Sequence, residues 1–295
     1  MFDTKIGAIP KYRRRVLLVT CLLAWLAAGC AHKPVMYAQK ARENVEQGLY
    51  DEAIGNYSMA IKADPRIAET YVDRGNVYAR RALSDYDTAI SDFTTAISID
   101  PSLVSAYINR GIAYSRRGYY DQAIADYTKV MELDPKNNYV YNLRGSVYFS
   151  RGQYDEAIGD FTKLIEINPR SSEAYYNRCD VYLYKGSYAK AVDDCSRANE
   201  IYPEFALPHY NQALAYEHEQ NVKDAIEAYK SFLKYASNQY ASRIDRAKQR
   251  IDVLERSLAG AATPPKEKQG EAIPAPAEKQ GEAAKAPAQP EQGGK

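Results

Sequence analysis

The sequence predicts an all-α fold, a solenoid of helix–turn–helix repeats, because one short pattern returns six times. A ring residue recurs every 34 or 36 residues, at Tyr37, Tyr71, Tyr107, Tyr141, Tyr175 and His209. An alanine keeps the same period, at Ala53, Ala89, Ala123, Ala157, Ala191 and Ala225. A proline does so at Pro65, Pro101, Pro135, Pro169 and Pro203. A period of this length is typical of units that bury their apolar faces against one another.

Each copy contains the signals for two helices. In one copy we expect the first helix over about Leu103–Arg117, and Gly118 ends it. The second helix is expected over about Tyr120–Leu133. Pro135 prevents that helix from continuing and opens the next copy. Small residues between the two helices should let them approach closely.

This pattern resembles the tetratricopeptide repeat (TPR) family. The signature residues of one copy are Tyr107, Gly111, Tyr114, Ala123, Tyr127 and Pro135. The resemblance implies six repeats over 34–237, at 34–67, 68–103, 104–137, 138–171, 172–205 and 206–237. It also implies a right-handed superhelix with a concave groove, and binding of other molecules in place of catalysis.

Two departures from the repeat pattern carry structural predictions. The second copy has two extra residues, which should lengthen its inter-helix turn around 82–84. After the sixth copy, apolar residues recur at helical spacing in Tyr240, Ile244, Ala247, Ile251, Leu254 and Leu258. We therefore expect 238–258 to form one amphipathic helix that caps the last repeat.

The N-terminal segment is expected to be a lipoprotein signal peptide over 1–29. Basic residues precede an uncharged run at 16–29, which is too short to span a bilayer comfortably. The run ends in Leu26-Ala27-Ala28-Gly29-Cys30, which is similar to a bacterial lipobox. The resemblance implies cleavage before Cys30, acylation of that cysteine (palmitate among the acyl chains), and a short linker at 30–33. An ordinary signal peptide with an incidental cysteine is the alternative.

The residue after Cys30 is Ala31. In Gram-negative lipoproteins this implies a periplasm-facing protein of the outer membrane, with inner-membrane anchoring left open. Residues 30–295 contain 34 Lys and Arg against 37 Asp and Glu, which argues against nucleic acid as a partner. The tail 259–295 is rich in Ala, Pro, Lys, Glu and Gln, and we expect it to be disordered.

Paired charges recur in repeats two to five. The basic members are Arg74, Arg110, Arg144 and Arg178, and the acidic members are Asp92, Asp126, Asp160 and Asp194. Repeats one and six lack both members. Because an unpaired charge beside the helix interface would be costly, these residues are interpreted as a structural ladder. The sequence leaves open whether each Arg meets the Asp of its own repeat or of a neighbour.

Two cysteines lie in the fifth repeat. Cys179 stands where repeats two to four have Gly, and Cys195 where the other repeats have Tyr or Phe. A disulfide is one interpretation for an exported chain, and two small buried side chains are the other. No metal site, cofactor site or catalytic residue is predicted, because no ligand spacing, phosphate loop or nucleophile motif occurs in the sequence.

The family resemblance places a set of first-helix residues in the concave groove. They are Arg42, Asn76, Arg80, Ile112, Arg116, Asn142, Phe149, Tyr176, Asp180, Tyr184 and Tyr210, together with Tyr139. Exposed aromatic and Arg side chains favour binding of proteins or peptides. The predicted function is thus an envelope scaffold that binds proteins, in the assembly of peptidoglycan enzymes, pili or secretion machinery. A module that binds cell-wall glycan through the groove aromatics is the alternative.

Overall fold

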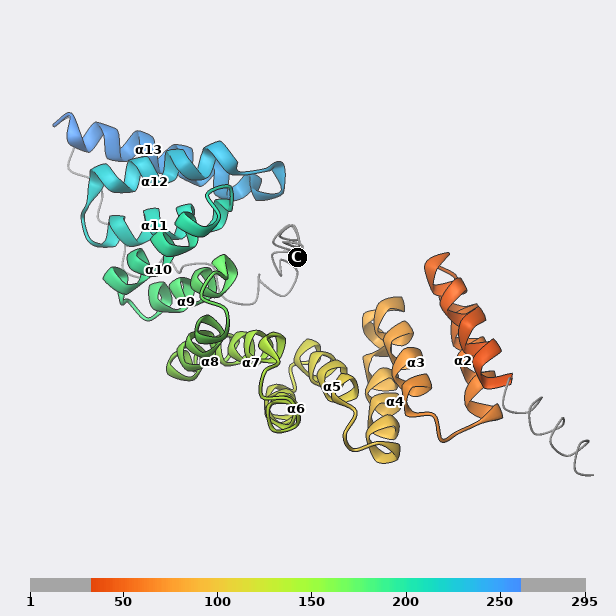
Figure 1. Ribbon diagram of the computed structural model, residues 1–295. Coiled ribbons are helices and arrows are strands. Elements are labelled where there is room, and N and C mark those ends of the chain that lie inside the picture. Colours follow the sequence, from red (N-terminus) through yellow and green to blue (C-terminus); the bar gives the residue numbers. More distant parts are fainter. Residues whose placement is uncertain (1–32, 261–295) are drawn as a thin grey trace, which may run out of the picture. The chain divides into compact units, whose positions relative to one another are not determined.

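The computed structural model describes residues 33–260, and the all-α prediction is confirmed within them (Figure 1). A first helix occupies 33–46. The others are α2 (Tyr50–Ala63), α3 (Ala68–Arg81), α4 (Tyr86–Ile99), α5 (Val104–Arg116), α6 (Tyr120–Leu133), α7 (Asn138–Ser150), α8 (Tyr154–Ile167), α9 (Ser172–Tyr184), α10 (Tyr188–Ile201), α11 (Ala206–His218), α12 (Val222–Tyr235) and α13 (Ala241–Leu258).

The chain forms two compact units, one ending at Arg117 and the other beginning at Gly118. In the first unit, α3 packs against α4, and α4 packs against α5. In the second unit each helix from α6 to α13 packs against the next one in sequence. Within each unit, consecutive helices therefore pack against one another, as expected for a solenoid.

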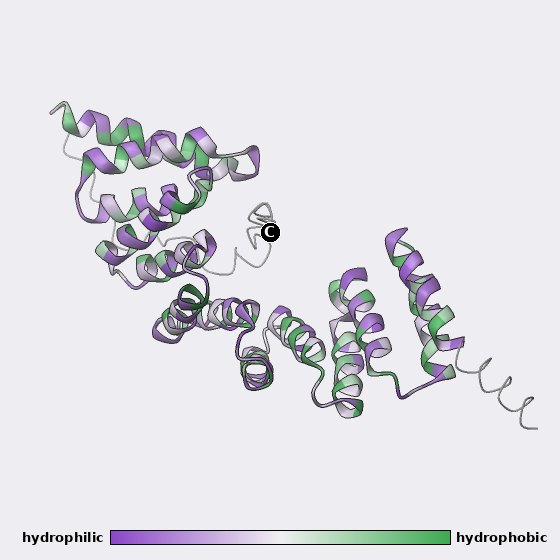
Figure 2. Cartoon of the chain, viewed as in Figure 1, coloured by the Kyte–Doolittle hydropathy of each residue, from purple (hydrophilic) through white to green (hydrophobic). Residues whose placement is uncertain are grey.

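Every helix carries both polar and apolar residues (Figure 2). The apolar positions form the core of each unit, which contains both small and large side chains. In the first unit Ala89, Phe93 and Ala96 of α4 are buried against Ala68 and Val72 of α3. No helix within 33–260 has both the length and the apolar content that a membrane span requires.

Glycines shape the turn between the two helices of several repeats. Gly48, Gly118, Gly152 and Gly186 follow a first helix and have φ between 73° and 77°. Glycine adopts this left-handed conformation without a Cβ clash, which is why it so often ends a helix. In the second repeat a short 3₁₀ turn, η1 (Leu83–Asp85), stands there instead. The two extra residues of that repeat are accommodated in this turn.

Close contact between paired helices depends on one small residue. In the second repeat a Cβ added to Gly75 of α3 would lie 2.7 Å from Cε1 of Phe93 on α4. In the fifth repeat the two equivalent positions hold Cys179 and Cys195, and the structure joins them in a disulfide with a Cα–Cα distance of 5.5 Å. A covalent link thus replaces the glycine–ring contact between α9 and α10.

The C-terminal helix covers the last repeat. The segment begins with a 3₁₀ turn, η2 (Asn238–Tyr240), and continues as α13. Ala247, Ile251 and Leu254 are buried in a cluster with residues of α11 and α12. Arg250 of α13 pairs with Glu217 of α11, with Nε 2.9 Å from Oε2. The apolar face that a seventh repeat would otherwise cover is therefore closed by α13.

Candidate binding surfaces

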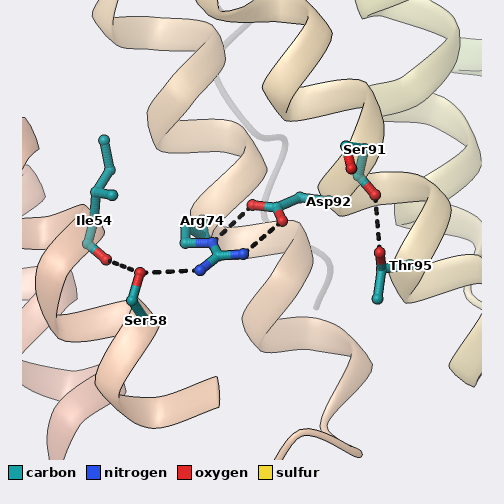
Figure 3. A network of polar contacts seen from close by, with 6 residues as sticks. All are labelled: Ile54, Ser58, Arg74, Ser91, Asp92 and Thr95. Atoms are coloured by element: carbon teal, nitrogen blue, oxygen red, sulfur yellow. Dashed lines mark hydrogen bonds and ion pairs between the residues drawn. The ribbon is translucent and has the colours of Figure 1, made fainter. Parts of the chain in front are cut away.

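The predicted Arg–Asp pairs form within a repeat and also reach the repeat before it. Arg74 donates from Nε and Nη2 to Asp92 at 2.8 and 2.7 Å (Figure 3). Its Nη1 donates to Ser58 Oγ of the preceding repeat at 2.9 Å. Ser58 in turn donates to the carbonyl of Ile54 at 2.7 Å. One guanidinium therefore ties three helices together.

The same geometry recurs in the second unit. Arg144 makes two hydrogen bonds to Asp160 and one to Thr128, and Arg178 does the same with Asp194 and Thr162, at 2.7–2.9 Å. Arg110 donates to Thr94 at 3.1 Å in the first unit. The question that the sequence left open is answered for Arg74, Arg144 and Arg178, since each meets the Asp of its own repeat.

These Arg–Asp pairs are buried, which indicates that their role is structural. The carboxylates of Asp92, Asp160 and Asp194 are 7–9% exposed, and their Arg partners 17–19%. The hydrogen bonds that each Arg donates to its carboxylate raise the pKa of that Arg above its usual value, although burial opposes this. Neighbouring tyrosine rings cover the guanidinium groups, as Tyr148 does for Arg144 at 5.5 Å. We call this set the inner ladder.

A second ladder, which was not predicted from the sequence, follows the helix ends. A basic residue at the end of a first helix pairs with an Asp at the start of the preceding repeat's second helix. The pairs are Arg81–Asp51, Arg117–Asp87, Arg151–Asp121 and Lys185–Asp155. The signal was present, because both members recur at the repeat period. These pairs are largely exposed, and each contributes little to stability.

The predicted groove residues divide by exposure. Arg42, Arg80 and Arg116 are exposed, and Arg42 pairs with Asp73 at 3.3 Å. Tyr139 is 55% exposed. Asn76, Ile112, Asn142 and Tyr184 are partly buried. These residues remain accessible to a partner.

The prediction of exposed groove aromatics is wrong for Phe149, Tyr176 and Tyr210, which are only 4–5% exposed. Each ring packs edge-on against another ring. Tyr176 contacts Phe205, Phe149 contacts Tyr184, and Tyr210 contacts Phe232, with centroids 5.0–5.1 Å apart.

Asp180 is also buried, at 4% exposed. These four side chains hold helices together. They cannot meet a partner without rearrangement, because their neighbours cover them.

A line of polar side chains connects the first helices of the second unit. Asn177 of α9 donates to Asn142 of α7 at 2.8 Å, and Asn142 donates to Glu173 at 3.3 Å. Asn211 of α11 donates to Asp180 of α9 at 2.9 Å. Neither Asn177 nor Asn211 was predicted from the sequence, although their spacing of 34 residues was a signal. Burial raises the pKa of Glu173 above its ordinary value.

This polar line borders a hollow of about 510 Å³. It is lined by Asp134, Lys136, Asn137, Asn138, Tyr139, Asn142, Leu164, Asn168, Ser171 and Glu173. The lining offers amide donors and acceptors, one ring and charges of both signs, which suits a peptide. Within 33–260 no group of His, Cys, Asp and Glu is arranged to hold a metal ion.

Comparison with known proteins gives one consistent result. A TPR repeat model matches residues 78–118 and 145–183, and tetratricopeptide repeat models match 104–137, 172–205 and 209–238. No curated protein matches the sequence.

Three solved structures illustrate the similarity. A tetratricopeptide repeat protein from Parabacteroides merdae is 18% identical, with a TM-score of 0.62, covering 79% of this chain and 94% of that one. MamA is 25% identical, with a TM-score of 0.53, covering 61% and 96%. YrrB, described as a TPR protein with an unusual peptide-binding site, is 19% identical, with a TM-score of 0.53, covering 65% and 97%.

Proposed function

Because the chain belongs to the tetratricopeptide repeat family, whose members are generally non-catalytic interaction scaffolds, we propose that it is an adaptor of the bacterial envelope. It binds a protein partner along the first helices of its second unit. A lipid on Cys30 holds it at the outer membrane, where it faces the periplasm and contributes to envelope assembly. Cys30 lies outside the described residues, so this part rests on the lipobox-like sequence alone.

The observation that carries the proposal is the polar surface of the first helices in the second unit. Tyr139 is exposed beside the amide of Asn142 and the carboxyl of Glu173, at the edge of the 510 Å³ hollow. Amide side chains can donate to and accept from the backbone of an extended peptide. A neighbouring Tyr supplies apolar contact area at low entropic cost. The described peptide-binding site of YrrB is consistent with this choice.

The aromatic residues favour protein over glycan. A glycan module needs ring faces open to solvent, and Phe149, Tyr176 and Tyr210 are covered by other rings.

In the first unit, the exposed Arg80 and Arg116 occupy equivalent positions in adjacent repeats. They would attract an acidic partner and accelerate its association at low salt.

The test is affinity capture from cross-linked envelopes with a first-helix variant. We would replace Tyr139, Tyr184, Arg80 and Arg116 with Ala, because none of these four is buried. Lys163→Ala on α8 is the matched control, since its side chain is 53% exposed. Loss of a partner that both the wild type and the control retain is expected. Equal capture by a folded quadruple variant would contradict the proposed surface.

Anchoring is tested separately. Cys30→Ser should abolish acyl labelling and leave an unprocessed precursor, while a purified soluble form should still bind the partner. If Cys30→Ser labels and fractionates like the wild type, the anchoring part fails and the binding part stands.

Removal of 261–295, which also lies outside the described residues, should change the free energy of unfolding by less than about 1 kcal/mol.

A further inference from the structure

The inner ladder has no Arg–Asp pair in the sixth repeat, where such a pair would contact the fifth repeat. We call this the missing ladder step. Gln212 of α11 stands where repeats two to five have Arg, and Ala228 of α12 stands where they have Asp. The hydroxyl that each ladder Arg contacts in the preceding repeat is still present, as Ser196 of α10. Gln212 Nε2 donates to Ser196 Oγ at 2.8 Å. The fifth repeat thus keeps the acceptor, but the sixth repeat has lost both the guanidinium and its carboxylate.

A groove of about 460 Å³ opens at this step. It is lined by Ser196, Asn199, Glu200, His209, Gln212, Tyr216, Asp224, Glu227, Ala228 and Ser231. These residues come from α10, α11 and α12, so the groove runs between two second helices. It is therefore distinct from the first-helix surface proposed above for a partner.

The lining is rich in hydrogen-bond acceptors and negative charge. Glu200, Asp224 and Glu227 contribute carboxylates, and none of the described residues that line the groove is Lys or Arg. Glu200 and Glu227 also face Arg197 and Lys230 in ion pairs whose side chains are at least half exposed, and such pairs are weak. Asp224 accepts from Asn221 at 2.6 Å.

One residue that lines the groove carries a buried acceptor without a donor. Asn199 Nδ2 donates to Gln212 Oε1 at 2.9 Å. Asn199 Oδ1 is buried and has no hydrogen-bond partner within the described part of the chain. A buried carbonyl without a donor is costly, so this atom favours a ligand that donates.

The ring that accompanies a ladder Arg is also retained. Arg144 lies over Tyr148 at 5.5 Å, and Arg178 lies over Tyr182 at 6.0 Å. Tyr216 occupies the same repeat position and lines the groove. A guanidinium in the groove would therefore meet the kind of ring, hydroxyl side chain and carboxylates that it meets in other repeats.

We propose that this groove binds the arginine side chain of a partner polypeptide, which completes the missing ladder step from outside. A guanidinium has five donors and no acceptor, which matches a lining of carboxylates and an unsatisfied carbonyl. Its planar shape suits the ring of Tyr216 better than an ammonium does. Residues 261–295 of this chain contain Lys but no Arg, so they do not supply the ligand.

The test uses the full chain and the peptide acetyl-Ala-Ala-Arg-Ala-Ala-amide, titrated by NMR while the amide signals of residues 196–231 are followed. Two matched peptides carry Lys or the uncharged isostere citrulline in place of Arg. One side chain should give a dissociation constant on the order of millimolar, and both matched peptides should bind at least about tenfold more weakly. Equal binding of the citrulline or the Lys peptide would overturn the proposal.

Two variants localise the site. Gln212→Arg with Ala228→Asp rebuilds the ladder step within the chain and should abolish peptide binding while raising the melting temperature. Asp224→Asn with Glu227→Gln keeps the shape and should weaken binding by about tenfold or more. Asn142→Ala on the first-helix surface is the control and should leave binding unchanged. Unaltered binding by both groove variants would refute the assignment, whatever the fate of the first-helix proposal.

Discussion

Phe161 of α8 lies directly against the backbone of Gly145 on α7. A Cβ added at Gly145 would stand 2.8 Å from Cε1 of Phe161 and 3.0 Å from Cζ. Real Cβ atoms do not approach a ring that closely, so the ring would have to move. Phe161 is 1% exposed, so a movement of its ring would disturb the side chains packed around it. The distance between the two helices of this repeat therefore depends on the absence of one methyl group.

Gly145→Ala should destabilise the protein by about 1–3 kcal/mol, because overpacking outweighs the helix propensity that Ala adds. Gly159→Ala on α8 is the matched control, since no atom lies within 4 Å of its added Cβ. The control should be stabilised by about 0.5–1 kcal/mol. Urea unfolding measures both values. A stabilised Gly145→Ala variant would mean that α7 and α8 can separate at little cost.

In the fifth repeat, where a disulfide joins the two helices, we expect substitutions at these positions to affect stability differently. Cys179 and Cys195 occupy the positions of Gly145 and Phe161, so Cys179→Gly combined with Cys195→Phe should restore a packed contact. Cys195→Phe alone should be strongly destabilising, because the ring would collide with Cys179. Reduction of the wild type should cost about 3 kcal/mol, the value expected for a loop of this length.

Thiol alkylation under denaturing, non-reducing conditions, followed by thermal unfolding of each variant, provides the measurement. Two free thiols in the purified protein would contradict the bond. A double variant less stable than the reduced wild type would show that the glycine–ring contact does not fit this repeat.

Some of this structure could be predicted from sequence and some could not, for a physical reason. Repetition at 34 residues identifies the helix pairs and the charges that must be partnered. It does not specify contacts between repeats, because these depend on how far each helix rotates relative to the next. Tyr176 was therefore expected in the groove, whereas it packs on Phe205. Asn177 was overlooked because its partner, Asn142, lies one repeat away.

The same reasoning applies to the ladder. The co-occurrence of Arg144 and Asp160 predicted a pair, but only the structure adds Thr128 as the link to the preceding repeat. The absence of the Arg and the Asp from the sixth repeat was equally visible in the sequence. The groove beside Gln212 and Ala228 could not be predicted from it, because the groove depends on how three helices pack.

The ladder itself can be tested in the fourth repeat. Asp160→Ala alone should cost about 3–5 kcal/mol, because it leaves the guanidinium of Arg144 buried without its carboxylate. Arg144→Gln combined with Asp160→Ala copies the pair that the sixth repeat has naturally, and should cost less than Asp160→Ala alone. Lys163→Ala with Glu166→Ala is the control, since both side chains are more than half exposed, and should change stability by less than about 1 kcal/mol. A double variant that is as unstable as the sum of its single variants would exclude coupling between the two residues.

His209 makes the last repeat sensitive to pH. Burial lowers the pKa of this imidazole below its ordinary value of 6.5, although the hydrogen bond between Nε2 and the carbonyl of Pro203, at 2.9 Å, opposes the shift. The folded protein therefore holds the proton less tightly than the unfolded chain does. The neutral imidazole therefore stabilises the fold in full above pH 6.5, and this stabilisation is lost as the pH falls through the folded-state pKa.

His209→Tyr is the informative variant, because all five other repeats have Tyr at this position. In the fourth repeat the hydroxyl of Tyr141 donates to the carbonyl of Pro135 at 3.4 Å, so a Tyr at 209 can reach Pro203 in the same way. Urea unfolding at pH 7.5 and pH 5.5 should show a larger loss of unfolding free energy for the wild type than for His209→Tyr. Glu173 titrates in both proteins, and its effect cancels in the comparison. Equal losses would mean that the imidazole is hydrated well enough in the folded state to accept its proton at no cost to the fold.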